Sequence, residues 1–409
     1  MHILHRILVL IAILLFSSNS SFAKASEKSK PPTCDQILSQ ASALFVQDSN
    51  GNTIYSKNIN SQYIPASTIK VLTAFVSLKV LGEDYRFHTK FYVDSDGNLK
   101  IKGFGDPFIT SEVMKSMTSL LSHRISTINN IVLDDTFFAQ GIEIPGSDGT
   151  LNPYDSPVGA LCVNFNTASV IKKNGIYTSG EAHTPITPYV VEMAKRYNIS
   201  SGRFLCARTQ EETTNYFGAL LFEFLNRAGV KIKGKILRGE VKSWDKLIID
   251  FESPHSLKFV MREMLKYSNN FIANQLFLVS GAKVLGAPAT LQKGAVVTRD
   301  VARSQLGFQD FSVVEGSGLS RENRLTAYQF MKLLKAFYPY MDLLKERNHV
   351  LYKTGTLKGV SNRIGYILVG EKLYPFVIIR NGNGPPSSSF IDCLQRELEK
   401  KDPKRTRVR

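Results

Sequence analysis

The apolar and polar positions along the chain predict a folded part that begins with a short sheet and continues into a buried helix. Residues 43–47 and 53–55 are apolar or alternating segments on either side of an Asn-Gly pair, which is typical of a β-hairpin. A mostly apolar run at 71–78, followed by Gly82, is long enough to favour a helix over a strand. Ser67 would lie at the start of this helix.

Between residues 84 and 253 the pattern predicts a separate α+β unit. A second hairpin is expected between Phe87 and Phe104, with an Asp-Gly turn at 96–97. The other elements expected here are strands at 131–133 and within 232–248, and helices at 111–124 and 216–228.

After this unit the helical pattern resumes. We interpret Ser253 and Pro254 as an N-cap followed by proline at the first helical position, opening a helix that ends at 267–270. Thr326 and Gln329 have the spacing of a capping box. Three strands and a closing helix are expected at 352–357, 363–369, 374–380 and 390–399.

Sheet and helix elements therefore occur at both ends of the sequence, with a large segment between them. This order predicts one discontinuous domain, residues 24–83 and 254–400, interrupted by an inserted domain at 84–253. Residues 401–409 form a basic tail.

The first residues predict an export signal. Arg6 precedes an apolar run at 7–16, and small residues follow up to Ala23 and Ala25. Ten apolar residues are too few to span a bilayer. We expect a signal peptide at 1–23, with cleavage after residue 25 as the alternative, and hence an exported, periplasmic protein; a buried core helix is the other interpretation of the run.

Composition and charge limit the classes of partner. With 409 residues, 43% of them hydrophobic, the chain can bury two ordinary cores, which excludes disorder as its main property. The net charge of +16 favours an anionic partner. Export argues against nucleic acid and leaves weak contact with an anionic membrane or cell-wall surface; the oligomeric state is left open.

The four cysteines are widely spaced and lack the close pairs of a zinc site, and the histidines show no metal-ligand spacing. No metal is expected. Export would permit two disulfides, and the domain division suggests Cys34 with Cys393 and Cys162 with Cys206. Free buried thiols are the alternative.

Three short motifs carry the candidate chemistry: Ser-x-x-Lys at 67–70, Ser-x-Asn at 268–270 and Lys-Thr-Gly at 353–355. Each is weak alone, and Ser-x-x-Lys also begins at Ser21, Ser169, Ser243 and Ser280. Only the Ser67 copy follows a hairpin and opens an apolar helix. The second motif follows a helix and the third begins a strand, so the ordered set is strong evidence for a serine acyl-transfer site.

These residue types suit nucleophilic attack. Ser67 and Lys70 share one helix face, so the amine can take the hydroxyl proton. Lys70 must then be partly neutral, and both burial and the second cation, Lys353, disfavour its charged form. The Ser67 N–H at the helix start, with the Thr356 N–H as a second donor, can hold a developing oxyanion.

The remaining motif residues suit the substrate and the leaving group. Ser268 can relay a proton to the leaving amine, and Asn270 can hold either Lys70 or the substrate amide. Lys353 and Thr354 suit a substrate carboxylate. Gly355 has no side chain to keep its strand away from the helix start.

With these motifs the chain resembles the D-Ala-D-Ala carboxypeptidases and endopeptidases of the low-molecular-mass class C penicillin-binding proteins. Ser67 and Ser268 are 201 positions apart, which leaves room for the inserted domain of that group. Other blocks that look like the family's lie at 103–107, 132–138, 316–321, 353–357 and 365–366.

The resemblance implies an α+β fold of the serine β-lactamase and penicillin-binding-protein transpeptidase type, with an antiparallel sheet flanked by helices and an inserted α+β domain. It implies a periplasmic serine hydrolase, without a cofactor, that cuts D-Ala-D-Ala stem peptides or D-Ala-diaminopimelate cross-links of peptidoglycan through an acyl-enzyme. β-Lactam antibiotics would be its covalent inhibitors.

The sequence also departs from the family. Asn269 stands where Ser-Asp-Asn is usual, the segment before Lys353 lacks an Asp-Gly-Thr-Leu block, and the insertion looks small. Residues 267–269 can also be read as the Tyr-x-Asn of class C β-lactamases, although the block at 265–277 favours Ser268 and Asn270. A β-lactamase and a catalytically weak cell-wall-binding or β-lactam-sensing module are the alternative functions.

Overall fold

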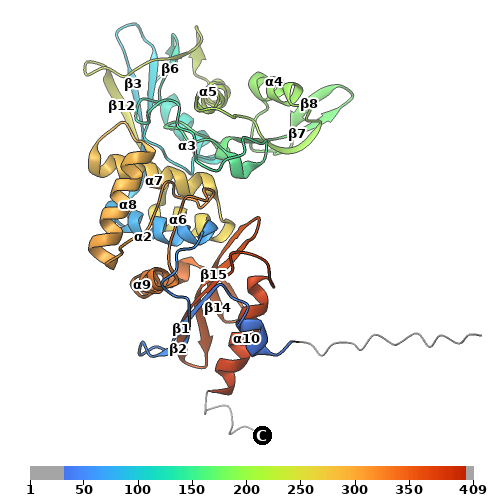
Figure 1. Ribbon diagram of the computed structural model, residues 1–409. Coiled ribbons are helices and arrows are strands. Elements are labelled where there is room, and N and C mark those ends of the chain that lie inside the picture. The colour runs from blue at the N-terminus through green and yellow to red at the C-terminus, as the bar shows by residue number, and fades with distance from the viewer. Residues whose placement is uncertain (1–31, 402–409) are drawn as a thin grey trace, which may run out of the picture. The chain divides into compact units, whose positions relative to one another are not determined.

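A six-stranded antiparallel sheet joins the two ends of the described chain (Figure 1). The computed structural model describes residues 32–401, so the expected signal peptide and residues 402–409 of the tail lie outside the described residues. The strand order is β13-β14-β15-β16-β1-β2, which places the N-terminal hairpin beside the last strand. The bounds are β1 (Ala43–Gln47), β2 (Thr53–Lys57), β13 (Lys345–Arg347), β14 (Val350–Leu357), β15 (Val360–Val369) and β16 (Lys372–Ile379).

Both faces of this sheet are covered by helices. Alternate residues of the central strands point to opposite faces, so Val377 packs into one core and Phe376 into another. One face packs on α1 (Cys34–Leu38) and α10 (Ser387–Lys400). On the other face, α9 (Ala327–Phe337) contacts β1 and β16 and leads into a 3-10 segment at Tyr338–Leu343. Helix α2 (Lys70–Leu81) contacts α9 and packs on α6 (Leu257–Tyr267), α7 (Asn270–Leu285) and α8 (Leu291–Leu306) within the same core.

A second, mixed sheet has five strands in the order β11-β6-β4-β3-β12. Its hairpin, β3 to β4, is the one expected between Phe87 and Phe104. Its apolar face packs on α3 (Ser111–Ser122) and α5 (Gln210–Arg227). The strands are β3 (Arg86–Val93), β4 (Leu99–Gly103), β6 (Ile131–Asp134), β11 (Ile236–Arg238) and β12 (Lys246–Ser256).

Smaller elements complete the middle of the chain. Two short strands pair in parallel, β5 (Thr127–Ile128) and β10 (Lys231–Ile232). Three form a separate antiparallel sheet, β7 (Thr167–Lys173), β8 (Ile176–Ser179) and β9 (Ser201–Leu205). The helical elements are α4 (Pro188–Arg196) and the 3-10 turns Pro153–Asp155 and Asn164–Asn166.

The expected helix start at Ser253 and Pro254 is wrong. Strand β12 continues through both residues to Ser256, whose hydroxyl caps α6 by accepting a backbone N–H at 3.3 Å. The pairing of β12 with β3 carries the strand this far, since Ser256 lies opposite Arg86. The register is irregular between residues 252 and 256, which is where a sheet tolerates a proline without an N–H.

The expected disulfides are also absent, because all four cysteines are free thiols in the structure. Cys34 and Cys393 are nevertheless hydrogen-bonding neighbours where α1 meets α10. Cys162 and Cys206 are buried and each donates to a backbone carbonyl, at 3.4 and 3.3 Å. Burial raises the pKa of Cys162 to about 12, so this thiol stays neutral at ordinary pH.

Candidate active site

Ser67 lies in a 3-10 turn, Ala66–Ile69, that runs directly into α2. The apolar residues of α2 are buried among the neighbouring helices, which fixes the end of the helix from which the turn projects. From the sheet side, the Asn362 amide donates to the carbonyls of Ile64 and Pro65 at 2.8 and 3.0 Å. Strand β15 therefore holds the backbone that leads to Ser67.

Two glycines lie against this turn. A β-carbon on Gly355 of β14 would stand 2.6 Å from the Pro65 carbonyl oxygen, and one on Gly318 would stand 2.1 Å from the carbonyl oxygen of Ala66. Gly318 also has φ +86°, which other residues rarely adopt. The close approach of β14, expected from Gly355, is thus present, and a second one from residue 318 encloses the turn.

Lys70 is fully buried, and its amine contacts three oxygen atoms. The distances from Nζ are 2.9 Å to Ser67 Oγ, 2.7 Å to Asn270 Oδ1 and 2.6 Å to the Ser317 carbonyl oxygen. Burial, followed by the positive charge of Lys353, holds the pKa of Lys70 well below its usual value, whereas Glu315 acts in the opposite direction. The geometry and the charges both favour a neutral amine beside Ser67.

The orientation of the Asn270 amide is fixed from both ends. Its oxygen faces Lys70, and its nitrogen donates to the Tyr154 carbonyl at 3.1 Å. The preceding residue, Asn269, caps α7 by accepting the Ile272 N–H at 2.9 Å. Asparagine and aspartate cap helices about equally well. The residue that departs from Ser-Asp-Asn, Asn269, can therefore cap α7 as an aspartate would.

Ser268 links α6 to α7 in the left-handed conformation and faces Lys353. The Lys353 amine donates to Ser268 Oγ at 2.8 Å and to the Thr354 carbonyl at 2.9 Å, and burial lowers the pKa of Lys353 to about 7. Tyr267 is 66% exposed. This arrangement supports the reading of the motif through Ser268 and Asn270 over the one through Tyr267 and Asn269.

The structure thus brings the predicted residues into two hydrogen-bonded groups. Ser67, Lys70 and Asn270 form one, and Ser268, Lys353 and Thr354 form the other. Gly355 follows on β14 against the Ser67 turn, and Thr356 comes next with an exposed side chain.

Several polar residues of the site were missed by the sequence reasoning. Glu315 is buried and shapes the segment whose Ser317 carbonyl contacts Lys70. Asn362 and the Tyr154 backbone have the contacts given above. The block at 316–321 was a signal for the first of these, because it matched the family pattern without an assigned task.

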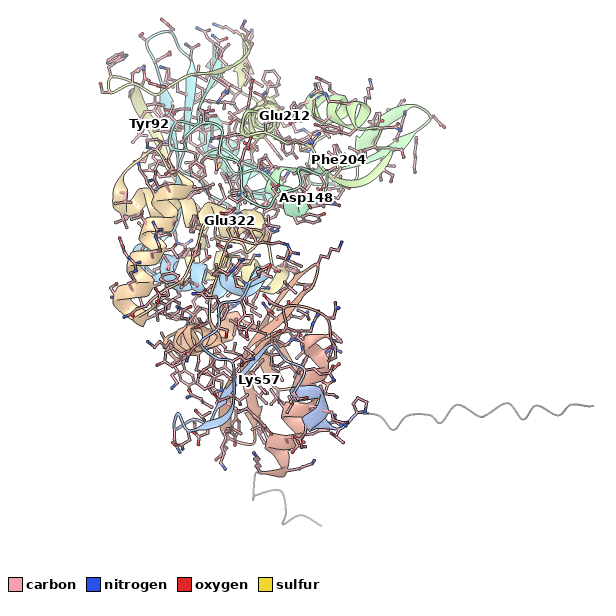
Figure 2. All side chains as sticks on the ribbon, in the orientation of Figure 1. Lys57, Tyr92, Asp148, Phe204, Glu212 and Glu322 are labelled. Carbon is pink, nitrogen blue, oxygen red and sulfur yellow. The ribbon has the colours of Figure 1, made fainter. Side chains whose placement is uncertain are left out.

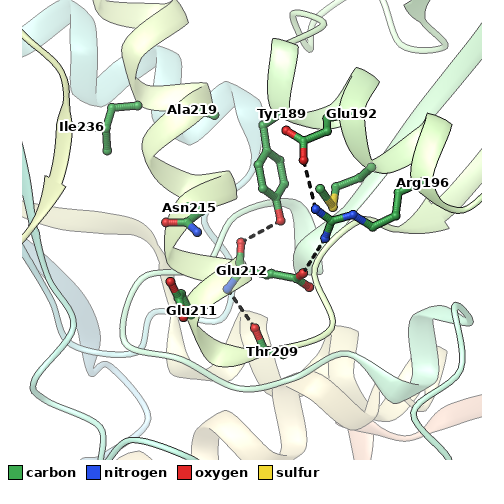
Figure 3. Close-up of a pocket in the computed structure, with 10 residues that line it drawn as sticks. Tyr189, Glu192, Arg196, Thr209, Glu211, Glu212, Asn215, Ala219 and Ile236 are labelled. Atoms are coloured by element: carbon green, nitrogen blue, oxygen red, sulfur yellow. Dashed lines mark hydrogen bonds and ion pairs between the residues drawn. The ribbon is translucent and has the colours of Figure 1, made fainter.

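A surface cavity of about 560 Å³ lies elsewhere, between α4 and α5 (Figure 3). Three of its charged groups pair with one another: Arg196 contacts Glu192 at 3.0 Å and Glu212 at 3.3 Å. Tyr189 donates to the Glu212 carbonyl at 3.2 Å. None of the predicted site residues lines this cavity, so its size does not make it the catalytic centre.

Residues 32–401 contain no cluster of three or more His, Cys, Asp or Glu side chains that could hold a metal ion. No helix in the same range has the length and apolarity needed to cross a membrane.

The chain is similar to known D-alanyl-D-alanine carboxypeptidases. The sequence profile of the D-Ala-D-Ala carboxypeptidase 3 (S13) family matches residues 32–202 and 198–345. The D-alanyl-D-alanine carboxypeptidase of Actinomadura sp. (strain R39) is 25% identical over 433 aligned positions, covering 87% of this chain and 80% of that protein. The carboxypeptidase DacB of Haemophilus influenzae is 24% identical over 406 positions, covering 83% of each.

Solved structures give the same fold. Penicillin-binding protein 4 of Haemophilus influenzae matches with a TM-score of 0.72 and 20% identity, over 90% of this chain and all of that one. A predatory endopeptidase of Bdellovibrio bacteriovorus matches with a TM-score of 0.53 and 15% identity, over 90% and 94%. The expected α+β fold of the penicillin-binding-protein type is confirmed.

Proposed function

Because the chain belongs to the D-Ala-D-Ala carboxypeptidase 3 (S13) family, whose members are serine peptidases, we propose that it cleaves D-Ala-D-Ala substrates through an acyl-enzyme on Ser67. The main support for this function is that three oxygen atoms surround the Lys70 amine. A neutral amine has two N–H groups and one lone pair. Two of its neighbours, the Asn270 amide oxygen and the Ser317 carbonyl, can only accept, so the lone pair is left for the Ser67 hydroxyl proton.

Acylation then follows from these positions. As Ser67 Oγ attacks the carbonyl carbon of the penultimate D-Ala, its proton passes to Lys70 and the carbonyl oxygen becomes an oxyanion. The backbone N–H groups of Ser67 and Thr356 stabilise that charge. Gly355 and Gly318 keep the Ser67 turn enclosed before the substrate arrives, so little backbone reorganisation accompanies the reaction.

The second hydrogen-bonded group serves the leaving amine. Ser268 passes its proton to the amine nitrogen as the peptide bond breaks and receives in its place the proton that Lys70 took from Ser67. D-Ala leaves, and the acyl chain stays on Ser67. Water later hydrolyses this ester, which releases the acid and restores the Ser67 hydroxyl. Lys353 holds Ser268 at 2.8 Å and, with Thr354, binds the carboxylate beside the scissile bond. Its pKa of about 7 rises when that carboxylate arrives, because an opposite charge favours the protonated form.

The substrates are stem peptides of peptidoglycan, and β-lactams are covalent inhibitors. The bound β-lactam in a second structure of the Haemophilus influenzae protein, with a TM-score of 0.67 and 22% identity over 90% of this chain and 98% of that one, supports this proposal. Action on peptidoglycan requires export to the periplasm, for which residues 1–23 are the proposed signal. Residues 24–83 and 254–400 are the proposed catalytic domain.

Residues 84–253 are the proposed inserted domain. Residues 34–401 belong to one compact unit, yet the two large sheets draw their strands from different segments. The six-stranded sheet uses only 43–57 and 345–379, and the five-stranded sheet only 86–134 and 236–256. This separation of strands supports the proposed boundaries near residues 84 and 253.

A fluorescent penicillin tests the nucleophile directly. We expect Ser67→Ala to abolish covalent labelling while circular dichroism and thermal unfolding stay close to wild type. Ser243→Ala is the matched control, because Ser243 begins another Ser-x-x-Lys sequence but is exposed in a turn. Labelling that survives in Ser67→Ala would refute the assignment. The lifetime of the wild-type adduct separates a peptidase, which keeps it, from a β-lactamase, which loses it quickly.

A further inference from the structure

Glu315 is a fully buried carboxylate with an unusual number of donors around it. All five contacts come from the segment that follows it, residues 317–323. They are the N–H of Ser317 at 2.7 Å, its hydroxyl at 2.6 Å, the N–H groups of Gly318 and Ser320 at 2.8 and 3.2 Å, and the Asn323 amide at 2.7 Å. The carboxylate therefore folds this segment around itself.

That segment contacts both the Lys70 amine and the backbone turn that holds Ser67. The Ser317 carbonyl accepts the Lys70 amine at 2.6 Å, and the Gly318 backbone lies against the Ser67 turn. Two further hydrogen bonds hold Gly316, the residue just before the segment. Its carbonyl accepts the Thr73 hydroxyl at 2.6 Å, and its N–H donates to the Asn274 amide oxygen at 2.8 Å. A change in the shape of the segment would therefore reach the base and the nucleophile together.

The contacts require a carboxylate in particular. Every neighbour donates, so the two oxygens of Glu315 act only as acceptors. Glutamine has the same size but only one oxygen, and its NH₂ group would face an N–H group. The same charge also reaches Lys70, where it raises the pKa against the lowering by burial and by Lys353.

We propose that Glu315 is a positioning residue for Lys70: it shapes residues 316–320 so that the Ser317 carbonyl orients the amine. The Glu315 charge also acts on this amine and favours its protonated form. The proposal rests on the acyl-transfer function above. The charged groups that face Lys70 are Lys353 from β14 and Glu315 from this segment, and they act in opposite directions.

The test is the pH dependence of the second-order rate of acylation by penicillin, measured per folded active site. This rate reports the protonation of the free enzyme. We expect Glu315→Gln to lower the rate about 10- to 100-fold near neutral pH, as a displaced catalytic group does. Because the variant loses a negative charge that raises the pKa of Lys70, the acidic limb should also move to lower pH.

Glu315→Asp retains the charge, so its acidic limb should stay at the wild-type pH although the rate falls. Glu322→Gln is the matched control, since Glu322 is an exposed glutamate of the same segment, labelled in Figure 2; its rate and limb should equal those of the wild type. A purely structural role for Glu315 predicts fewer active molecules and an unmoved limb in Glu315→Gln, and that result would overturn the proposal.

If Glu315→Gln does not fold, Asn323→Ala replaces it. This variant removes one donor to Glu315 but retains the charge, and we expect slower acylation without a shift of the limb. Wild-type acylation per folded molecule in both Asn323→Ala and Glu315→Asp would refute the proposal. Failure of the wild-type protein to be acylated would refute the function itself, so the two failures are distinct.

Discussion

The Lys70 amine nitrogen lies 2.7 Å from the side-chain oxygen of Asn270, a residue 200 positions further along the chain. The amide cannot present its nitrogen instead, because that nitrogen is bonded to the Tyr154 carbonyl. Asn270 therefore acts on Lys70 as an acceptor, which directs one N–H of the amine away from Ser67.

Removal of the base should be nearly as damaging as removal of the nucleophile. We expect Lys70→Ala to slow penicillin acylation about 10²- to 10⁴-fold, the usual contribution of a positioned general base. Lys70→Arg should not restore the rate, since a guanidinium stays protonated. Stopped-flow acylation measures this, with the exposed Lys246→Ala as control. Wild-type acylation by Lys70→Arg would contradict the base assignment.

The middle residue of the second motif should matter for stability more than for chemistry. Asn269→Ala removes the cap of α7 and should lower the free energy of unfolding by about 1 kcal/mol. Asn269→Asp keeps a capping oxygen and should unfold like the wild type with an unchanged acylation rate. Denaturant unfolding and penicillin labelling measure the two effects. A large loss of acylation in Asn269→Asp at unchanged stability would show that Asn269 has a catalytic task.

The carboxylate role of Lys353 predicts how activity depends on substrate and pH. A peptide ending in D-Ala-D-Ala should be cleaved much faster than its C-terminal amide. The Lys353 charge lowers the pKa of Lys70, and a bound carboxylate partly neutralises that charge. The pKa of Lys70 is then higher in the complex, so the acidic limb of kcat should lie at higher pH than that of kcat/KM. Equal cleavage of acid and amide would refute the role.

Oxidation should join one pair of cysteines. Cys34 and Cys393 are neighbours at the contact of α1 with α10, so mild oxidation should bridge them and stabilise the fold by about 2–4 kcal/mol. Cys162 and Cys206 should stay reduced. Non-reducing peptide mapping checks this, with Cys393→Ser as control. A peptide joining Cys34 to Cys162 would contradict both the pairing and the proposed domain division.

Local patterns predicted the elements whose signal lies within a few residues. The hairpin at 43–57, the three strands from Val350 to Ile379 and the capping box at Thr326 are confirmed. Helix α8 was not predicted, although its buried residues Ala295, Ala302 and Leu306 have helical spacing. Several residues of its buried face are small and give a weak apolar signal, such as Gly294, which packs on Phe277. The Ser253 prediction failed because pairing with a strand some 160 residues earlier decided the local structure.

In the site, too, residues that lie close together in the sequence could be predicted. Ser67, Lys70 and the other motif residues could be found because each motif spans only three or four positions. The block at 316–321 pointed to the neighbourhood of Glu315 but not to its task, since that task depends on a contact between Ser317 and Lys70 that spans 247 positions. A single acidic residue in a polar segment has no local feature that separates it from an exposed one such as Glu322.

The bond between the Asn270 amide and the Tyr154 carbonyl has a consequence for truncated or transplanted forms of this enzyme. Tyr154 belongs to the segment at 84–253, and all three motifs lie outside it. A shortened chain that joined residue 83 to residue 254 would retain every motif residue. Its asparagine, however, would be free to turn its nitrogen toward Lys70, so the middle segment is part of what makes the lysine a base.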